Sequence, residues 1–139
     1  MPIINISLYE GKSPEFKKKI SDAIHAAMTE VLHVPLDTYD HFFFDKAKSD
    51  MVFDRNYFGI ERTEDMIFIQ FFFNTRPPAL KAKFFDRVAH EITTRVPSHR
   101  QEDLLMCIVE VAPENWWAYG RTIDPVTGYD TRMKDGGEV

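Results

Sequence analysis

The chain opens with Met1-Pro2 and continues into the apolar, β-branched run Ile3-Ile4-Asn5-Ile6-Ser7-Leu8-Tyr9. The run predicts a strand that enters the core. Because proline is small, we expect methionine aminopeptidase to remove Met1 and leave Pro2 as a secondary amine. An α-amino group has an ordinary pKa of about 7.7–8.0, so a small decrease makes it a neutral base at cellular pH. Proline also begins strands for structural reasons alone, and the dipeptide leaves both interpretations open.

The residues that follow predict a helix and then a second strand. Ser13 fits a helix N-cap, with Pro14 at the first helical position. Apolar residues then recur at three- and four-residue spacing, which predicts an amphipathic helix that ends before Pro35. Within residues 37–45, the run Phe42-Phe43-Phe44 predicts a largely buried strand.

The same order returns about 65 residues later. A third strand is predicted at residues 66–73, and a second helix is predicted to start at Pro77-Pro78. A fourth strand is predicted at residues 104–111. The charged connection 46–65 leaves room for a short hairpin that pairs residues 51–53 with residues 57–60. The pattern is that of a tandem β-α-β duplication.

This duplication predicts an α+β fold. Right-handed crossovers place both helices on one face of a four-stranded sheet. We expect a single domain over residues 1–139, with β-α-β units at 1–45 and 66–111, a connecting loop at 46–65 and a C-terminal tail at 112–139.

Composition argues against several classes of protein. A net charge of −5 without a dense basic stripe argues against a nucleic-acid partner. Neither an apolar run long enough to span a membrane nor a secretion signal is visible, so we expect a cytoplasmic protein without membrane contact. The one cysteine, Cys107, lies in an apolar run and is expected to be an inert buried thiol.

Metal and cofactor patterns are also missing from the sequence. His90-Glu91 begins like a zinc-binding helix, but Thr94 stands where the second histidine is needed. The other histidines (His25, His33, His41 and His99) show no metal-ligand spacing and are expected to be surface or capping residues. We expect no metal and no cofactor.

Arg76 is the side chain best placed to bind an anion. It lies at the carboxyl end of a predicted strand, in the turn before a helix, where open sheets bind ligands. A guanidinium holds a carboxylate through two parallel hydrogen bonds. A surface ion pair is the simpler alternative. Trp116, Trp117 and Tyr119 after the last strand fit either ordinary core or the roof of a small apolar pocket or subunit contact.

Four local patterns, in order along most of residues 2–121, add a family resemblance. They are Pro2-Ile3-Ile4 with Leu8-Tyr9-Glu10-Gly11, Val34-Pro35 before Asp37-Thr38-Tyr39, Thr75-Arg76-Pro77, and Trp116-Trp117 with Tyr119-Gly120-Arg121. Together they resemble the tautomerase superfamily, with its 4-oxalocrotonate tautomerase-like fold, and within it the malonate semialdehyde decarboxylase-like branch.

The resemblance implies roles for particular residues. Pro2 matches the catalytic N-terminal proline, and Arg76 matches an arginine that grips the substrate carboxylate. Asp37 matches the aspartate that positions water in the decarboxylase, if one gap is allowed after Pro35. The decarboxylase has a second arginine where this chain has Pro78, which puts decarboxylation in doubt.

The resemblance also implies a homotrimer in which C-terminal segments help to wall the neighbouring site. It makes Trp116, Trp117, Tyr119 and Arg121 candidate substrate-binding residues beside Arg76. The expected activity is keto–enol tautomerisation of small oxo or enol carboxylates by Pro2. The alternatives are a lyase or hydratase with protonated Pro2 and water directed by Asp37, and a non-catalytic oligomeric binding protein.

Overall fold

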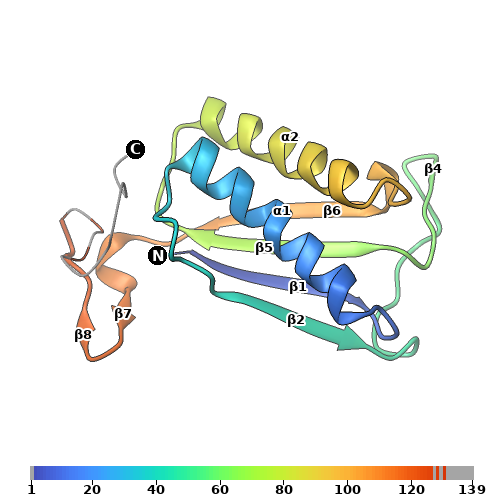
Figure 1. Ribbon diagram of the computed structural model, residues 1–139, viewed down its shortest axis with the longest axis horizontal. Helices are drawn as coiled ribbons and strands as arrows, with labels where there is room; N and C mark the ends of the chain where they lie inside the picture. Colours follow the sequence, from blue (N-terminus) through green and yellow to red (C-terminus); the bar gives the residue numbers. More distant parts are fainter. Residues whose placement is uncertain (1, 127, 129, 131–139) are drawn as a thin grey trace.

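The computed structural model describes residues 2–126, 128 and 130 as a four-stranded sheet with two helices on one face (Figure 1). The strand order is β2-β1-β5-β6. The sheet strands are β1 (Ile3–Tyr9), β2 (His41–Lys46), β5 (Ile67–Phe73) and β6 (Leu104–Glu110), and the helices are α1 (Pro14–Leu32) and α2 (Pro78–Arg95). The predicted α+β fold with its repeated β-α-β order is confirmed.

Each β-α-β unit is followed by a short hairpin. The pairs are β3 (Asn56–Tyr57) with β4 (Ile60–Glu61) and β7 (Trp117–Ala118) with β8 (Arg121–Thr122). Single turns of 3-10 helix, η1 (Gln101–Asp103) and η2 (Pro113–Asn115), flank β6. The first hairpin does not use residues 51–53 as expected, because Phe58 and Gly59 both have positive φ and form its two-residue turn.

Local sequence explains where α1 begins and ends. The Ser13 hydroxyl accepts a hydrogen bond from the Phe16 backbone N–H at 3.1 Å, and Pro14 occupies the first turn. At the other end His33 takes a left-handed conformation, with φ of 53°, and donates its backbone N–H to the Met28 carbonyl. No described helix is both long and apolar enough to cross a bilayer.

Strand directions decide which segments meet at the catalytic candidate Pro2. β1 runs antiparallel to β5 and parallel to β2, and β6 runs parallel to β5. The amino ends of β1 and β2 therefore lie at the same end of the sheet as the carboxyl ends of β5 and β6. This end, called the Pro2 end below, also carries the loop 36–40, the turn 74–77 and the β7–β8 hairpin (Figure 1).

The core lies between the sheet and the helices. Alternate residues of β1 and β5 face the helices, and the largest fully buried side chains of the sheet are Ile4, Ile6, Leu8, Ile67, Ile69, Phe71 and Phe73. Phe71 and Phe73 both meet the ring of Phe84 from α2 edge-on. This packing fixes the carboxyl end of β5, from which the turn to Arg76 departs.

The opposite, open face of the sheet carries neither α1 nor α2, and most of its side chains are apolar. The strand register aligns Phe44, Ser7, Phe68 and Leu105 in one row across it. The expectation that residues 37–45 form a largely buried strand is wrong for the single chain, because β2 is an edge strand. Phe42 and Phe44 point away from the helices and are 50% and 43% exposed.

Cys107 also belongs to this open face, in the row that contains Gln70. Its thiol is only partly buried, so the expectation of a buried thiol is wrong. The apolar run around it does not bury every residue, because alternate side chains of a strand point to opposite faces.

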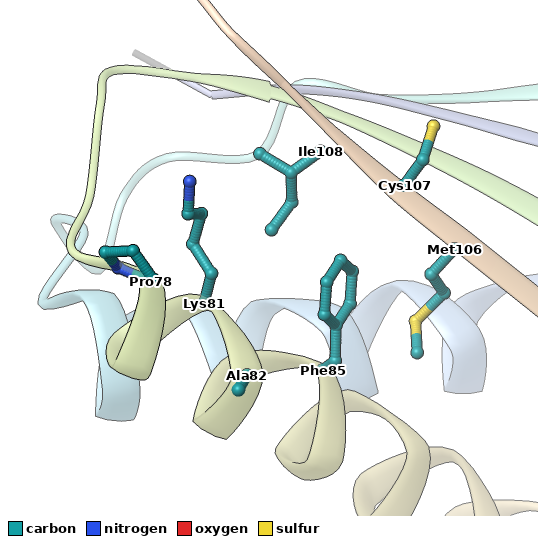
Figure 2. Close-up of a pocket in the computed structure, with 7 residues that line it drawn as sticks. All are labelled: Pro78, Lys81, Ala82, Phe85, Met106, Cys107 and Ile108. Carbon is teal, nitrogen blue, oxygen red and sulfur yellow. The ribbon is translucent and has the colours of Figure 1, made fainter.

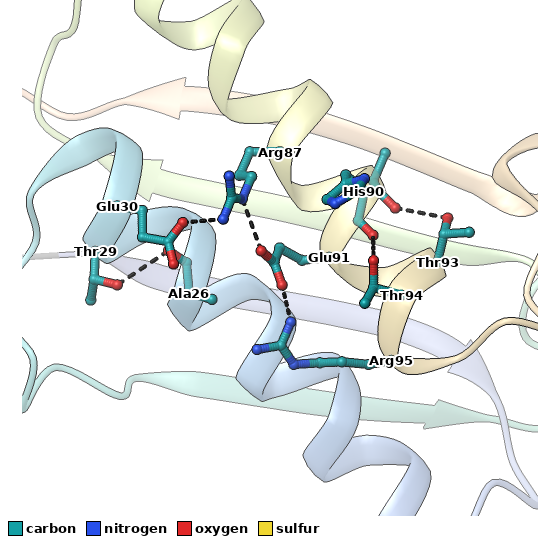
Figure 3. Close-up of polar contacts among 10 residues, drawn as sticks. Ala26, Thr29, Glu30, Arg87, His90, Glu91, Thr93, Thr94 and Arg95 are labelled. Carbon is teal, nitrogen blue, oxygen red and sulfur yellow. Dashed lines mark hydrogen bonds and ion pairs between the residues drawn. The ribbon is translucent and has the colours of Figure 1, made fainter.

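A charged network joins the two helices on their outer surface (Figure 3). Arg87 of α2 donates from Nε to Glu91 at 2.8 Å and pairs through Nη2 with Glu30 of α1, while Arg95 pairs with the other oxygen of Glu91. Burial raises the pKa of Glu91, but hydrogen bonds and charges from Arg95 and Arg87 outweigh it and hold the pKa below its usual value.

Glu91→Gln should therefore destabilise the fold by about 1–2 kcal/mol at pH 7, since Arg87 and Arg95 both lose the almost buried carboxylate that they share. A carboxylate with a lowered pKa stabilises the folded state above its unfolded pKa, and this contribution fades as pH falls through the folded pKa. In urea titrations below pH 4, the difference in the free energy of unfolding between wild type and Glu91→Gln should therefore become smaller.

Glu30→Gln is the matched control, because Glu30 is the exposed end of the same network. Its cost should stay within about 0.5 kcal/mol. If both variants lose the same free energy of unfolding at pH 7, Glu91 contributes no more to stability than the exposed Glu30.

Candidate active site

Pro2 is buried directly before β1. β1 pairs Ile3 with Phe72 on one side, and the Ile4 N–H donates to the Asp40 carbonyl at 2.9 Å on the other. The same register, extended by one residue, places Pro2 between Phe73 and Tyr39. The Pro2 ring therefore lies on the side of the sheet that carries the helices, at the end of the core.

Arg76 approaches the same point from the turn after β5. Its guanidinium carbon lies 5.7 Å from the centre of the Phe73 ring, and Nη1 donates to the carbonyls of Asn74 at 2.9 Å and Thr75 at 3.2 Å. Phe73 is thus the common neighbour of Pro2 and Arg76. The sequence-based position of Arg76, between a strand end and a helix start, is correct.

Glu110 holds the turn that carries Arg76. It accepts the Arg76 backbone N–H at 2.9 Å and the Lys81 ammonium at 2.9 Å. The Lys81 hydrogen bond, followed by that of the Arg76 amide, keeps the pKa of Glu110 below its usual value. Lys81 thereby offsets the negative charge of Glu110 beside this turn.

Asp37 lies in the loop between α1 and β2, where its side chain is exposed. The turn is closed by the Thr38 N–H, which donates to the Pro35 carbonyl at 3.1 Å. The loop brings Asp37 to the Pro2 end, but the residue of this loop level with Pro2 is Tyr39.

Sequence reasoning missed a cluster around Tyr39. The Tyr39 ring stacks on His25 of α1 at 3.8 Å, and His41 Nδ1 shares a hydrogen bond with the Ser21 hydroxyl at 2.7 Å. Burial and then the nearby His25 lower the pKa of His41 to about 4, so His41 is neutral at pH 7. The only signal in the sequence was the position of His41 at the start of a strand.

The expectation of surface or capping histidines holds for His33, which caps α1. It is wrong for His99, which is buried and bonded through a ring nitrogen to the Asp65 carbonyl at 3.0 Å. Among the described parts of the chain, no three His, Cys, Asp or Glu side chains are grouped so that they could hold a metal ion.

The tail residues divide into buried and exposed ones. Trp116 is 7% exposed and, with Ala118 and Ile123, packs against Ile3 and Phe72. Ile3 and Phe72 point to the open face of the sheet, so Trp116 lies on the face opposite Pro2. Sequence spacing could not distinguish it from its neighbour Trp117, which is 68% exposed.

Tyr119 and Arg121 are exposed and have acidic partners. The Tyr119 hydroxyl donates to Asp40 at 3.2 Å, and the charge of Asp40 raises the pKa of the phenol. Arg121 forms a two-pronged pair with Asp130, at 2.9 and 2.6 Å. Of the predicted substrate-binding residues, Arg76 is the one that lies over Phe73, which the extended register sets opposite Pro2.

A cleft of about 480 Å³ opens beside this site, between α2 and the edge strand β6 (Figure 2). Lys81 and Phe85 of α2 face Ile108 and Met106 of β6 across it, while Cys107 points away to the other face of the strand. The cleft begins at Pro78, two residues after Arg76.

Two family models match the chain. Both are described as tautomerase enzymes, one matching residues 37–117 and the other residues 2–59. The probable tautomerase YusQ of Bacillus subtilis is 30% identical over 117 residues, which cover 84% of this chain and 91% of that protein. The chain belongs to the tautomerase family.

Other tautomerase-family proteins are similar over nearly the same length. The probable tautomerase YrdN of Bacillus subtilis is 24% identical over 84% of the chain and 89% of its own length. A crystal structure of malonate semialdehyde decarboxylase superposes with a TM-score of 0.80 at 19% identity, covering 86% of this chain and 93% of that one. A fused 4-OT trimer subunit gives 0.68 at 16% identity, covering 86% and 94%. These structures share the fold.

The resemblance drawn from the sequence is therefore confirmed at the level of the tautomerase family. Within this family fold, the Pro2 end combines a buried strand start, a guanidinium packed on Phe73 and an acidic loop. Such a set can bind a small anion and, if the Pro2 nitrogen is a free amine, exchange a proton with it.

Proposed function

We propose that this protein is a tautomerase that uses the amine of Pro2, after removal of Met1, on small oxo or enol carboxylates. Met1 lies outside the described residues. The geometry that supports the proposal centres on Phe73: the β1–β5 register, extended by one residue, sets Phe73 opposite Pro2, and the guanidinium of Arg76 lies over its ring. A carboxylate held by Arg76 would then present its α-carbon or enol hydroxyl towards Pro2.

The tautomerase proposal needs a neutral proline. Burial and a nearby guanidinium both disfavour a charged ammonium, whereas a nearby carboxylate such as that of Asp37 favours it. We propose that the first two effects prevail. Neutral Pro2 takes a proton from the enol hydroxyl or α-carbon and returns it at another carbon. Arg76 anchors the carboxylate and stabilises the negative charge that develops on the enolate.

The second candidate is a decarboxylase or hydratase, in which protonated Pro2 polarises a carbonyl and Asp37 directs water. The loop that carries Asp37 at the Pro2 end favours it. The replacement of the second arginine by Pro78 counts against it, since half of the carboxylate clamp is lost. A non-catalytic oligomeric binding protein is the third candidate.

Asp37→Asn separates the two enzyme proposals. For a tautomerase we expect ketonisation to stay within about threefold of wild type, because no water is activated. The rate should rise with pH through the Pro2 pKa, since the neutral amine is the base. Initial rates with phenylenolpyruvate between pH 5 and 9 measure both quantities.

A lyase or hydratase predicts a different pH profile and a different effect of Asp37→Asn. A rate that falls with rising pH, together with a loss of about 10²–10⁴-fold in Asp37→Asn, would make the lyase or hydratase the better account. Asp50→Asn is the matched control, because Asp50 is an exposed acid that follows the carboxyl end of β2, at the end of the sheet opposite Pro2.

The open apolar face supports a homo-oligomer. The large apolar side chains that stay exposed on it are Phe42, Phe44, Leu105 and Val109. A monomer would leave these side chains in water and both edge strands unpaired. We propose that three copies bury it, as the trimeric 4-OT relatives suggest.

The expected particle is a trimer of about 49 kDa, three times the chain mass of 16.3 kDa. Light scattering at micromolar concentration measures it. Phe44→Lys on the open face should shift the particle towards monomer, whereas Lys48→Glu, on the exposed surface after β2, should not. A wild-type chain that stays monomeric would contradict the assembly.

A further inference from the structure

Asn74 connects three parts of the Pro2 end. Its side-chain oxygen accepts the indole N–H of Trp116 at 2.7 Å, and its side-chain nitrogen donates to the Gly128 carbonyl at 3.3 Å. Its backbone carbonyl accepts Nη1 of Arg76 at 2.9 Å. One residue therefore contacts the guanidinium, the start of the β7–β8 hairpin and the C-terminal segment.

The chemistry of the asparagine side chain suits this place. A carboxamide can accept and donate at the same time, which aspartate and leucine cannot. The partner Trp116 is almost fully buried against Ile3 and Phe72, so its indole N–H needs an acceptor inside the protein. Asn74 supplies that acceptor from the carboxyl end of β5.

Gly128 fits closely against the same side chain. Its φ is +72°, and a Cβ at this position would lie 2.4 Å from Asn74 Nδ2. Only glycine allows this approach without a shift. The carboxamide of Asn74 is thus enclosed between Trp116 on one side and the backbone of Gly128 on the other.

The turn held in this way is the turn that orients Arg76. Nη1 of Arg76 rests on the carbonyls of Asn74 and Thr75, so the direction of the guanidinium follows the position of these two peptide groups. Glu110 fixes the Arg76 backbone N–H from β6. The Asn74 side chain fixes the start of the turn, two residues before Arg76, from the opposite face of the sheet.

We propose that Asn74 is a positioning residue for Arg76, which couples the direction of the guanidinium to the packing of the C-terminal hairpin and tail. The proposal rests on the proposed function in one respect, namely that Arg76 holds the substrate carboxylate. If the Asn74 hydrogen bonds stabilise only the hairpin and tail, replacing Asn74 will leave the orientation of the Arg76 guanidinium unchanged.

A spectroscopic test separates these possibilities without any activity. In ¹⁵N–¹H spectra, Asn74→Ala should move the indole signal of Trp116 and speed its exchange with water, and should also move the Nε–H signal of Arg76. The indole signal of exposed Trp117 is the internal control. An unchanged Arg76 signal beside a shifted Trp116 signal would overturn the proposal.

Two further variants test the geometry. Asn74→Asp keeps an acceptor for Trp116 and should retain most of the indole protection. In the wild-type background, Gly128→Ala should shift the Trp116 and Arg76 signals as Asn74→Ala does. In the Asn74→Ala background the close contact is already relieved, so Gly128→Ala should cause a smaller further shift. Equal additional shifts in both backgrounds would contradict the proposed contact.

The kinetic test is a double-mutant cycle with phenylenolpyruvate. Asn74→Ala should raise KM at least fivefold and change kcat less than threefold, because the carboxylate is held in the wrong place while Pro2 is intact. In the Arg76→Ala background it should raise KM no further. Equal increases in both backgrounds would overturn the proposal. A wild-type chain without turnover would instead count against the proposed function, while the Arg76 and Trp116 signals still decide the role of Asn74.

Discussion

Blocking the Pro2 amine should remove catalysis almost completely. We expect a chain extended at its amino end by a cleavable peptide to be at least 10²–10⁴-fold less active than the same chain after cleavage before Pro2, because an amide nitrogen has no basic lone pair. Turnover of phenylenolpyruvate by the two forms measures the effect. Their sequences are identical from Pro2 onwards.

Two controls test whether the extension acts through the Pro2 amine and not through the fold. Circular dichroism and melting temperature should agree between the extended and the cleaved form, since β1 begins at Ile3 in both. Pro2→Ala, which keeps an amine but loses the rigid ring, should retain more activity than the extended chain. Full activity in the extended chain would show that the Pro2 amine is not the base.

Loss of Arg76 should give the second largest effect. Arg76→Lys keeps the charge but loses the planar fork that binds both carboxylate oxygens. We expect kcat/KM to fall at least tenfold, about 1.4 kcal/mol of transition-state stabilisation, and to fall further in Arg76→Ala. Steady-state kinetics on an enol carboxylate measure the loss.

Arg100→Lys is the matched control for Arg76. Arg100 donates to the Glu61 carbonyl at the opposite end of the sheet, and its replacement should leave kcat/KM unchanged. If both Arg76 variants fold normally and keep full activity on a carboxylate substrate, Arg76 serves the structure alone and the substrate binds elsewhere.

The fold was predictable because both halves of the chain carry the same local signals. Ser13-Pro14 and Pro77-Pro78 start the helices, and an apolar run forms each of the four strands of the sheet. Right-handed crossovers then placed both helices on one face of the sheet, whereas the strand order β2-β1-β5-β6 was not predicted. The position of Arg76 followed from these elements, since it depends only on a strand end and a helix start.

Contacts between distant segments could not be read from the pattern. The stack of Tyr39 on His25 and the bond between Asn74 and Trp116 join residues 14 and 42 positions apart. The exposure of Phe42 depends on which strand forms the sheet edge. A cytoplasmic location and the absence of a nucleic-acid partner stay predictions.

The most direct test of the central claim is the intact mass of the protein isolated from its own cells. The account predicts a chain that lacks Met1, with Pro2 as a free secondary amine. Because a proline with a residue before it has an amide nitrogen, a native protein that retains Met1 would contradict catalysis by Pro2.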